Sequence, residues 1–486
     1  MLLESLRGLG YTTATAIADI IDNSVSAGAC NVDVRFEWAG SDSWVRVSDD
    51  GCGMTDAELE KAMQLGASDP RHARRSDDLG RFGMGLKTAS FSQARVLTVC
   101  SRRAGGEATC LRWDLDVLET IVGGDWPMIE GPRPGSEARV ALSDGYASGT
   151  VVLWEGLDRI VTSGFTSDDL FDVLEMVEGH LAMVFHRLMG TASGQIDLRL
   201  NGKRVKPWDP FLTGNLAKRL ESLEYALIGA PEVKVQLNVL PHKDMMETSE
   251  FEAAAGPEGW TSQQGFYIYR NKRLLAVSGW LRLGERGRQW SRDEAHRLAR
   301  IRLDIPNTMD SEWNINVLKS TASPPVRLRP QLLRLAKEAR EVARNVYAFR
   351  GRLISEGSKG KEGLPDIWEA IKKPSGATAY RLSRQHDLYR SVMDRAGPLA
   401  KDIEALIRLV EGTVPVQRIW LDTAEDDEPP VSSFDDEPDP ALVEMMEAMF
   451  DALVHGCGLS EAEARERLSR TRPFDKRPDL IAGLGE

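Results

Sequence analysis

The chain has 486 residues, 42% hydrophobic and 28% charged, which is the balance of a globular protein with room for two to four domains. The formal net charge is −13, but nine of the acidic side chains lie in residues 421–440, so the acidic total does not exclude a polyanion-binding face elsewhere. No apolar run approaches the roughly 20 residues of a membrane-spanning helix, and the N-terminus lacks the layout of a signal peptide.

The first 165 residues are expected to form one α+β unit. Thr12 or Thr13 can cap a helix that runs to about residue 27, because a threonine oxygen accepts hydrogen bonds from free amides at a helix start. Apolar patterning predicts a helix at 56–65, a polar loop at 66–85, and strands at 31–36, 44–48, 96–101, 108–115 and 149–154. Helices and strands that do not strictly alternate favour a sandwich over a doubly wound sheet.

A second unit is expected at 166–350. It begins with a helix to about residue 188, followed by a strand at 196–200 and the turn signal Asn201-Gly202. Further predicted elements are strands at 233–239 and 265–269, a turn at Asn271-Lys272 and a helix at 328–349. The rest of the chain is expected to comprise a linker at 351–365, a helical region at 366–420, an acidic disordered linker at 421–440 and a small helical tail at 441–486.

The cysteines and histidines point to no metal or disulfide framework. Five scattered cysteines without a C-x-x-C pair argue for a reducing compartment, so we expect a cytoplasmic protein with no membrane partner. The seven histidines form no ligand cluster; His180 and His186 lie on a predicted helix and suit core or surface positions.

Asp19 and Asn23 lie four residues apart on the first predicted helix, so they share one face. An amide oxygen can coordinate Mg²⁺ on a nucleotide while a carboxylate orients a water molecule. Taken alone, the same pair also fits an ordinary solvated helix face.

Two further motifs have the residues that an adenine pocket needs. In Asp49-Asp50-Gly51-Cys52-Gly53-Met54 a carboxylate at a strand end can accept a hydrogen bond from an exocyclic amine, and two glycines let the backbone pass close to a flat ring. The alternative is a simple turn. Gly149-Thr150 opens a later strand and places a hydroxyl at its start, but many strands begin in this way.

The segment Gly80-Arg81-Phe82-Gly83-Met84-Gly85-Leu86-Lys87 places three glycines before a predicted helix. Bare amides at a helix start bind phosphate, and Lys87 could add a cation. The preceding residues are polar and Arg-rich rather than a strand, which argues against a Rossmann fingerprint, and the classical P-loop pattern is absent.

In order and spacing, these motifs resemble the GHKL ATPase superfamily of gyrase, heat-shock chaperones, histidine kinases and MutL, and most closely its MORC and MutL-like members. The resemblance covers about residues 10–155 and implies a Bergerat α/β sandwich that binds Mg²⁺ and ATP. It assigns Mg²⁺ to Asn23, adenine to Asp49 with Thr150, the floor of the base pocket to Gly51 and Gly53, and an ATP lid to about 64–85. The candidate ATP-binding residues are Asn23, Asp49, Gly51, Gly53, Met54, Gly80, Arg81, Phe82, Gly83, Met84, Gly85, Lys87 and Thr150.

The resemblance maps the water-activating acid to Asp19, where the family usually has glutamate. Aspartate is one methylene shorter, so we expect slow hydrolysis or action through a second water molecule. Ser26 also replaces an aspartate often found three residues after the asparagine.

The second unit resembles the transducer domain that follows the ATPase in MORC, MutL and gyrase. Its carriers are the segments Asn201 to Pro207 and Gly265 to Arg273. Transducers place a basic side chain on the γ-phosphate, and Lys319 is the best candidate; a plain surface lysine is the alternative. Residues 270–302 hold ten Lys or Arg against three acids, which suggests either a DNA-facing patch or a solvated helix.

Two classes of function follow. The first is a slow ATPase that acts as an ATP-gated dimeric clamp in DNA metabolism or anti-phage defence, with double-stranded DNA and other repair or defence proteins as partners. The second is a nucleotide-switched chaperone-like or scaffold protein that does not bind DNA. A histidine kinase is disfavoured, because no helix with a phosphoacceptor histidine precedes the first motif.

Overall fold

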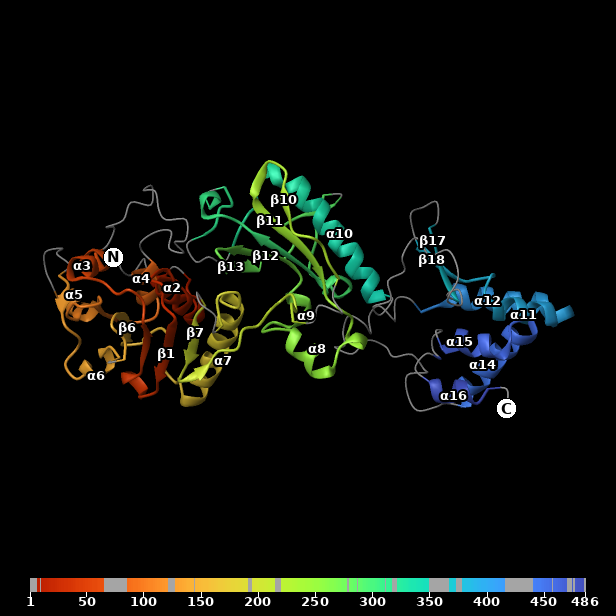
Figure 1. The fold of residues 1–486 in the computed structure, drawn as a ribbon, viewed down its shortest axis with the longest axis horizontal. Coiled ribbons are helices and arrows are strands. Elements are labelled where there is room, and N and C mark those ends of the chain that lie inside the picture. Colours follow the sequence, from red (N-terminus) through yellow and green to blue (C-terminus); the bar gives the residue numbers. More distant parts are fainter. Residues whose placement is uncertain are drawn as a thin grey trace. The chain divides into compact units, whose positions relative to one another are not determined.

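The computed structural model has two compact units, residues 1–353 and 354–486. It describes residues 7–8, 10–64, 85–120, 127–143, 145–190, 195–214, 220–277, 279–285, 287–310, 312–316, 321–348, 367–372, 378–415, 440–456, 458–469, 474 and 477–484 (Figure 1). Residues 65–84 of the expected lid, the linker at 351–365 and residues 421–439 of the acidic segment lie outside these residues.

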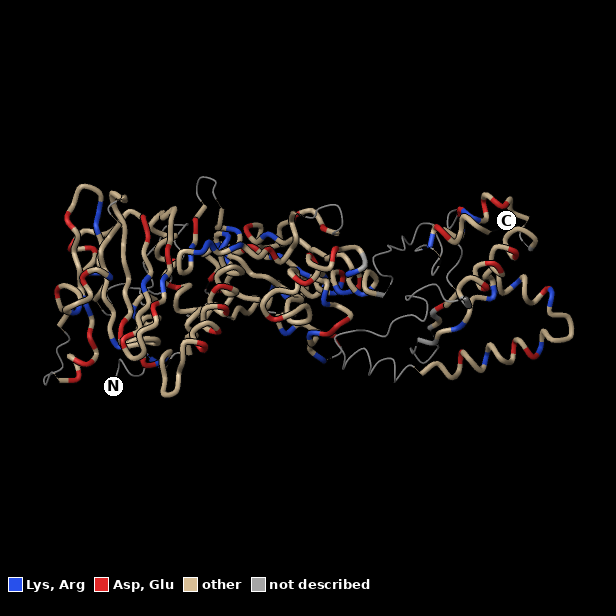
Figure 2. Tube along the Cα trace, turned by 90° about the horizontal axis from the view of Figure 1, so that it is seen from below, with Lys and Arg blue, Asp and Glu red and all other residues tan. Residues whose placement is uncertain are grey.

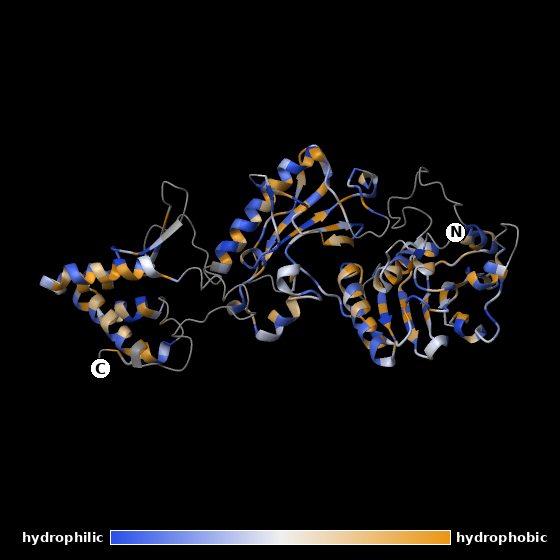
Figure 3. Cartoon of the chain, turned by 180° about the vertical axis from the view of Figure 1, so that it is seen from behind, coloured by the Kyte–Doolittle hydropathy of each residue, from blue (hydrophilic) through white to orange (hydrophobic). Residues whose placement is uncertain are grey.

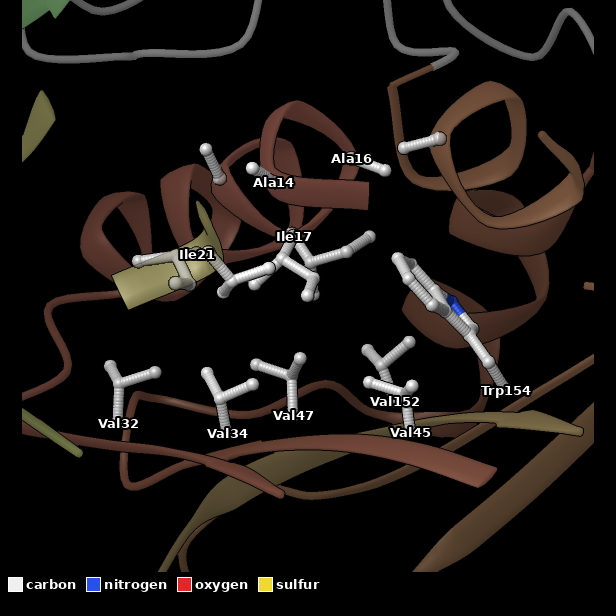
Figure 4. Packing of buried hydrophobic residues seen from close by; sticks show 14 of the residues in the cluster. Ala14, Ala16, Ile17, Ile21, Val32, Val34, Val45, Val47, Val152 and Trp154 are labelled. Atoms are coloured by element: carbon white, nitrogen blue, oxygen red, sulfur yellow. The ribbon is translucent and has the colours of Figure 1, made fainter. Parts of the chain in front are cut away.

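Helix α2 (Thr13–Ser26) joins the first motif to the core. The side chain of Thr12 accepts a hydrogen bond from the amide of Thr15, and the hydroxyl of Thr15 accepts one from the amide of Thr12. This reciprocal pair is a capping box, which stabilises the start of the helix. One turn apart, Ile17 and Ile21 face the valines of the sheet, including Val34 (Figure 4). All three apolar side chains are fully buried, so the helix is held against the sheet by its apolar face.

Within the described residues, the first sheet has eight strands in the order β5-β4-β3-β6-β2-β1-β7-β8. They are β1 (Asn31–Glu37), β2 (Trp44–Asp49), β3 (Val96–Arg102), β4 (Thr109–Asp114), β5 (Ile129–Glu130), β6 (Gly149–Glu155), β7 (Asp197–Leu200) and β8 (Lys203–Arg204). Neighbours are antiparallel, except that β1 and β7 run parallel. This mixed sheet with helices confirms the predicted α+β class.

Helices cover both faces of this sheet. Helix α2 contacts α4 (Gly85–Phe91) and α7 (Ser167–Val184) on one face, while on the other α6 (Glu137–Val140) packs near Cys100 and Leu153. Two further helices, α3 (Asp56–Met63) and α5 (Leu115–Thr120), connect the strands. Hydrophobic residues concentrate on the strands and on the helix faces that meet them (Figure 3).

The chain stays in the first sheet longer than the sequence indicated. Strand β7 pairs with β1 through Val32 and Leu198, and the Asn201-Gly202 turn, with both φ angles positive, leads directly to β8. Residues 197–204 therefore belong to the first sheet, although the second unit was expected to begin at 166. The pairing joins residues about 165 apart in sequence, which local patterns do not reveal.

The second sheet has the order β10-β11-β16-β12-β13, with β9 beside β11. Its strands are β9 (Leu220–Glu221), β10 (Tyr225–Leu227), β11 (Ala230–Val239), β12 (Gly265–Arg270), β13 (Arg273–Val277) and β16 (Ala299–Asp304). Helix α10 (Arg329–Ala348) packs on β11 and β16. Helices α8 (Thr248–Ala254) and α9 (Gly259–Ser262) and the hairpin of β14 (Gly284–Glu285) and β15 (Arg288–Gln289) complete the unit.

The C-terminal unit is mainly helical, as predicted, but it begins with a hairpin. Strands β17 (Trp368–Lys372) and β18 (Thr378–Leu382) pair antiparallel where helix was expected. Aromatic and β-branched residues such as Trp368, Ile371 and Tyr380 favour strands there. The helices are α11 (Asp387–Ala396), α12 (Ala400–Thr413), α14 (Pro440–Asp451), α15 (Glu461–Ser469) and α16 (Pro478–Ala482).

The expectation of no disulfide is wrong for one pair. Cys100 of β3 lies directly opposite Cys110 of β4, and the two form a disulfide. The spacing of the five cysteines in the sequence did not indicate this pairing. Cys30 and Cys52 are free and exposed. Among the described residues, no three His, Cys, Asp or Glu side chains gather as a metal site, and none of the helices there has the length and apolar character to cross a bilayer.

Candidate nucleotide-binding site

Asp49 is held in a fixed orientation at the end of β2. Ser24 of α2 donates a hydrogen bond of 2.8 Å to Oδ2, and the amide of Gly51 donates one of 2.9 Å to Oδ1. Thr150, which the resemblance assigns to adenine together with Asp49, is the register partner of Asp49 on β6. Burial raises the pKa of Asp49, and the two hydrogen bonds oppose that effect. The structure thus brings Asp49 and Thr150 together as the sequence suggested.

The glycines around Asp49 leave no room for a side chain. A Cβ on Gly53, whose φ is +64°, would lie 1.9 Å from the carbonyl oxygen of Arg102. On Gly51 it would lie 2.8 Å from the Cβ of Ala27, and on Gly149 it would lie 2.2 Å from the carbonyl oxygen of Asp49. Three backbone segments therefore approach one another closely around this carboxylate.

Substituting Gly53 with alanine should destabilise the first unit. The left-handed backbone alone costs about 1–2 kcal/mol for a residue with a Cβ, and the collision with the Arg102 carbonyl adds to it. Urea denaturation should show a lower free energy of unfolding, while Gly145→Ala, where the nearest atom is 3.7 Å away and φ is not positive, should be close to wild type. Equal stability of both variants would contradict this close approach.

Ser101 links two of the predicted residues and was missed by sequence reasoning. Its hydroxyl lies 2.9 Å from that of Thr150 and accepts a hydrogen bond of 2.8 Å from the amide of Met54. Ser101 is the β3 register partner of Thr150. The only sign of it in the sequence is its position at the end of an apolar strand.

The two neighbouring aspartates of the second motif have different roles. Asp50 accepts hydrogen bonds from the amides of Cys30 and Asn31 and from the side chain of Asn31, at 2.6–2.8 Å. These contacts close the connection between α2 and β1. Asp49 is therefore the one carboxylate of this pair that faces the glycines.

Asp19 and Asn23 occupy different environments on α2. Asp19 is buried, and the hydroxyl of Tyr11 donates a hydrogen bond of 2.8 Å to its Oδ2. Burial and the nearby carboxylate raise the pKa of Tyr11. Gly85 opens α4 beside Asp19, since a Cβ there would lie 3.6 Å from Oδ2. Asn23 is exposed, so its amide oxygen is accessible to a metal ion that takes most of its ligands from phosphate and water.

Lys87 is buried and already has partners. Its Nζ donates hydrogen bonds to the carbonyl oxygens of Ala62, at 2.9 Å, and Gln64, at 2.6 Å, and burial lowers its pKa. The ammonium thus ties the start of α4 to the end of α3, across the expected lid. The remaining lid candidates, Gly80, Arg81, Phe82, Gly83 and Met84, lie outside the described residues.

Arg273 brings a cation from the second sheet to helix α2. Its Nε donates a hydrogen bond of 3.0 Å to Asp22, and its Nη2 lies 4.0 Å from Oδ1 of Asp19. The sequence had suggested Lys319 for a basic contact from this unit, and Lys319 lies outside the described residues. In the sequence, Arg273 is recognisable only as the end of the segment Gly265 to Arg273 and as one of the basic residues of 270–302.

The described basic residues of 270–302 do not all lie on the surface. Arg270, Arg273 and Arg300 are 0–3% exposed, and Arg300 donates hydrogen bonds to the carbonyl oxygens of Pro210 and Ala254. Arg297 and Arg302 form ion pairs with acidic neighbours. Along the described chain, acidic and basic residues are interspersed (Figure 2). A count of charges in the sequence gives no information on which side chains are buried. Among the described residues of this range, the exposed cations are Lys272, Arg282, Arg288 and Arg292.

Residues 11–150 match the family of Histidine kinase-, DNA gyrase B-, and HSP90-like ATPases. ATPase morc-1 of Caenorhabditis elegans is 32% identical over 91 residues, which are 19% of this chain and 10% of that protein. DNA mismatch repair protein MutL of Paramagnetospirillum magneticum is 33% identical over 111 residues, 21% of this chain and 17% of that protein. The chain thus spans less than a fifth of these relatives.

Among solved structures, the chain is similar to the ATPase region of Saccharomyces cerevisiae topoisomerase II. The match covers 68% of this chain and 86% of the topoisomerase chain. The sequence identity is 12% and the TM-score is 0.38.

Proposed function

We propose that the chain binds ATP with Mg²⁺ beside Asp49 and hydrolyses it slowly, because residues 11–150 match the histidine kinase-, gyrase B- and HSP90-like ATPases. The observation that carries this proposal is the Asp49 carboxylate, held by Ser24 and Gly51 among three closely approaching backbone segments. A carboxylate fixed in this way is suited to accept a hydrogen bond from the exocyclic amine of adenine.

The remaining roles are those that the resemblance implies, and burial and position agree with them. Asn23, exposed on α2, would hold Mg²⁺, which neutralises phosphate charge when bound. Asp19, buried one turn earlier, would orient the attacking water and take its proton. Its side chain is shorter than the glutamate usual in this superfamily, and this is our reason for expecting slow turnover.

At the level of the whole protein we propose an ATP-gated dimeric clamp in DNA metabolism or defence. Support comes from the relatives, one of which is a DNA mismatch repair protein. The burial of Arg270, Arg273 and Arg300 favours the second candidate, a nucleotide-switched scaffold without DNA binding, because it removes much of the expected basic face.

Light scattering with a non-hydrolysable ATP analogue tests the clamp. We expect a monomer without nucleotide and a dimer with the analogue, and Asp49→Ala should stay monomeric because it binds the analogue poorly. Added duplex should bind the dimer with an affinity that falls steeply between about 50 and 200 mM salt. A monomer under every condition would contradict the clamp, while a dimer without duplex binding would support the scaffold.

A further inference from the structure

We propose that Arg273 is a positioning residue through which the second sheet sets the place of Asp19. The proposal deepens the function above and rests on Asp19 being the hydrolytic carboxylate. Arg273 is the first residue of β13, immediately after the turn of Asn271 and Lys272, whose φ angles are 48° and 68°. That left-handed turn fixes where the arginine leaves the hairpin.

The guanidinium of Arg273 is held on three sides. Its Nε donates to Asp22 at 3.0 Å, its Nη1 donates to the carbonyl oxygen of Leu274 at 2.8 Å, and its Nη2 lies 4.0 Å from Asp19. Because a guanidinium is a planar fork, fixing two of its nitrogens fixes the third. Asp19 and Asp22 are three residues apart on α2, so one side chain from the second sheet lies close to two carboxylates of one helix.

The attraction between Arg273 and the two aspartates is strong enough to depend on their exact positions, because all three side chains are buried. Arg273, Asp19 and Asp22 are each at most 5% exposed, so their attraction is little screened by water. His180 nearby does not compete as a cation, since burial and the charge of Arg273 lower its pKa to about 4. The ring of Phe185 lies 5.9 Å from the guanidinium.

The two oxygens of Asp19 are approached from different parts of the unit. Tyr11, which precedes α2, donates to Oδ2, whereas Arg273 of the second sheet lies near Oδ1. A cleft of about 950 Å³ opens beside this contact, and its lining includes Tyr11, His180 and Leu275. The two sheets are therefore not fully packed here, and a shift of β13 would move the guanidinium relative to Asp19.

Kinetics of Arg273→Gln, Arg273→Lys and Lys272→Gln test the proposal. Arg273→Gln should lower kcat by about 10²-fold, the effect expected of a misplacement of about 1 Å, with the Kd for ATP unchanged. Arg273→Lys should recover part of kcat, because it keeps the charge without the fork. Lys272→Gln changes an exposed cation one residue away on the same turn and should match wild type. A Kd that rises as much as kcat falls, or a kcat that rises, would overturn the positioning role.

A double-mutant cycle with Asp22→Asn separates positioning from independent effects. If Arg273 acts through α2, the losses in kcat of Arg273→Gln and Asp22→Asn should not add, and additive losses would count against the proposal. Arg273→Lys and Asp22→Asn keep the test available if Arg273→Gln fails to fold.

Hydrogen exchange of the protein without nucleotide gives a readout that does not depend on ATP. Arg273→Gln should speed exchange in α2 while Lys272→Gln leaves it unchanged. Faster exchange together with a wild type that neither binds nor hydrolyses ATP would reject the proposed function but keep the link between the sheets. Unchanged exchange in α2 would reject the link itself.

Discussion

Replacing Asp19 with asparagine is expected to slow ATP hydrolysis by about 10²–10⁴-fold while ATP still binds. The amide has the size and shape of the carboxylate and can still accept the hydrogen bond from Tyr11, but it cannot take a proton from water. The measurement is single-turnover hydrolysis beside equilibrium ATP binding. Asp56→Asn, an exposed aspartate in the first turn of α3, is the matched control and should be unaffected.

Turnover of Asp19→Asn at the wild-type rate would place the base elsewhere. Asp22 is a poor replacement, because one of its oxygens already accepts a hydrogen bond from Arg273 and the side chain is 1% exposed. Loss of ATP binding together with turnover would show instead that Asp19 supports the pocket rather than the chemistry.

Replacing Asp49 with alanine is expected to lower ATP affinity by about tenfold to a hundredfold, the effect of losing a charged hydrogen bond worth roughly 1.5–3 kcal/mol. Adenine presents an amine donor where guanine presents a carbonyl acceptor, so the wild type should prefer ATP to GTP. Asp49→Ala should lose that preference, and Asp49→Asn, which keeps one acceptor oxygen, should lose less. Calorimetric titration with both nucleotides measures each effect.

Low pH should weaken the same contact between the Asp49 carboxylate and ATP. Because burial raises the pKa of Asp49, its carboxylate gains a proton at a higher pH than an exposed aspartate would. Lowering the pH through that raised pKa should therefore weaken ATP binding in the wild type more than in Asp49→Ala. Unchanged affinity in both Asp49→Ala and Asn23→Ala would remove the basis for placing the nucleotide here.

The parts of the site that depend on local pattern were predictable. Helix α2, strand β2 and the glycines after it follow from periodicity and spacing, and the structure places Asp49 beside Thr150 as expected. The contacts of Ser101 were not predictable, because they depend on which strands become neighbours. The ion pair of Arg273 and Asp22 spans 251 positions in sequence, and no local pattern contains it.

The failed predictions share one physical cause: sequence shows residue type but not burial or pairing. Arg300 was counted as a surface cation, yet it is enclosed between Trp208 and Trp260 with its charge directed at backbone carbonyls. Cys100 and Cys110 were treated as scattered, yet antiparallel register sets them opposite one another. Tertiary context decided both cases.

The buried ammonium of Lys87 has a consequence for how α3 and α4 are joined. Through two carbonyl oxygens it fixes Ala62 and Gln64, at the end of α3, beside the start of α4. An ammonium in this position loses its hydration, so both carbonyl oxygens are needed to replace the water that it gives up. Neutralising that one amine would weaken both hydrogen bonds and loosen the attachment of α3 to α4.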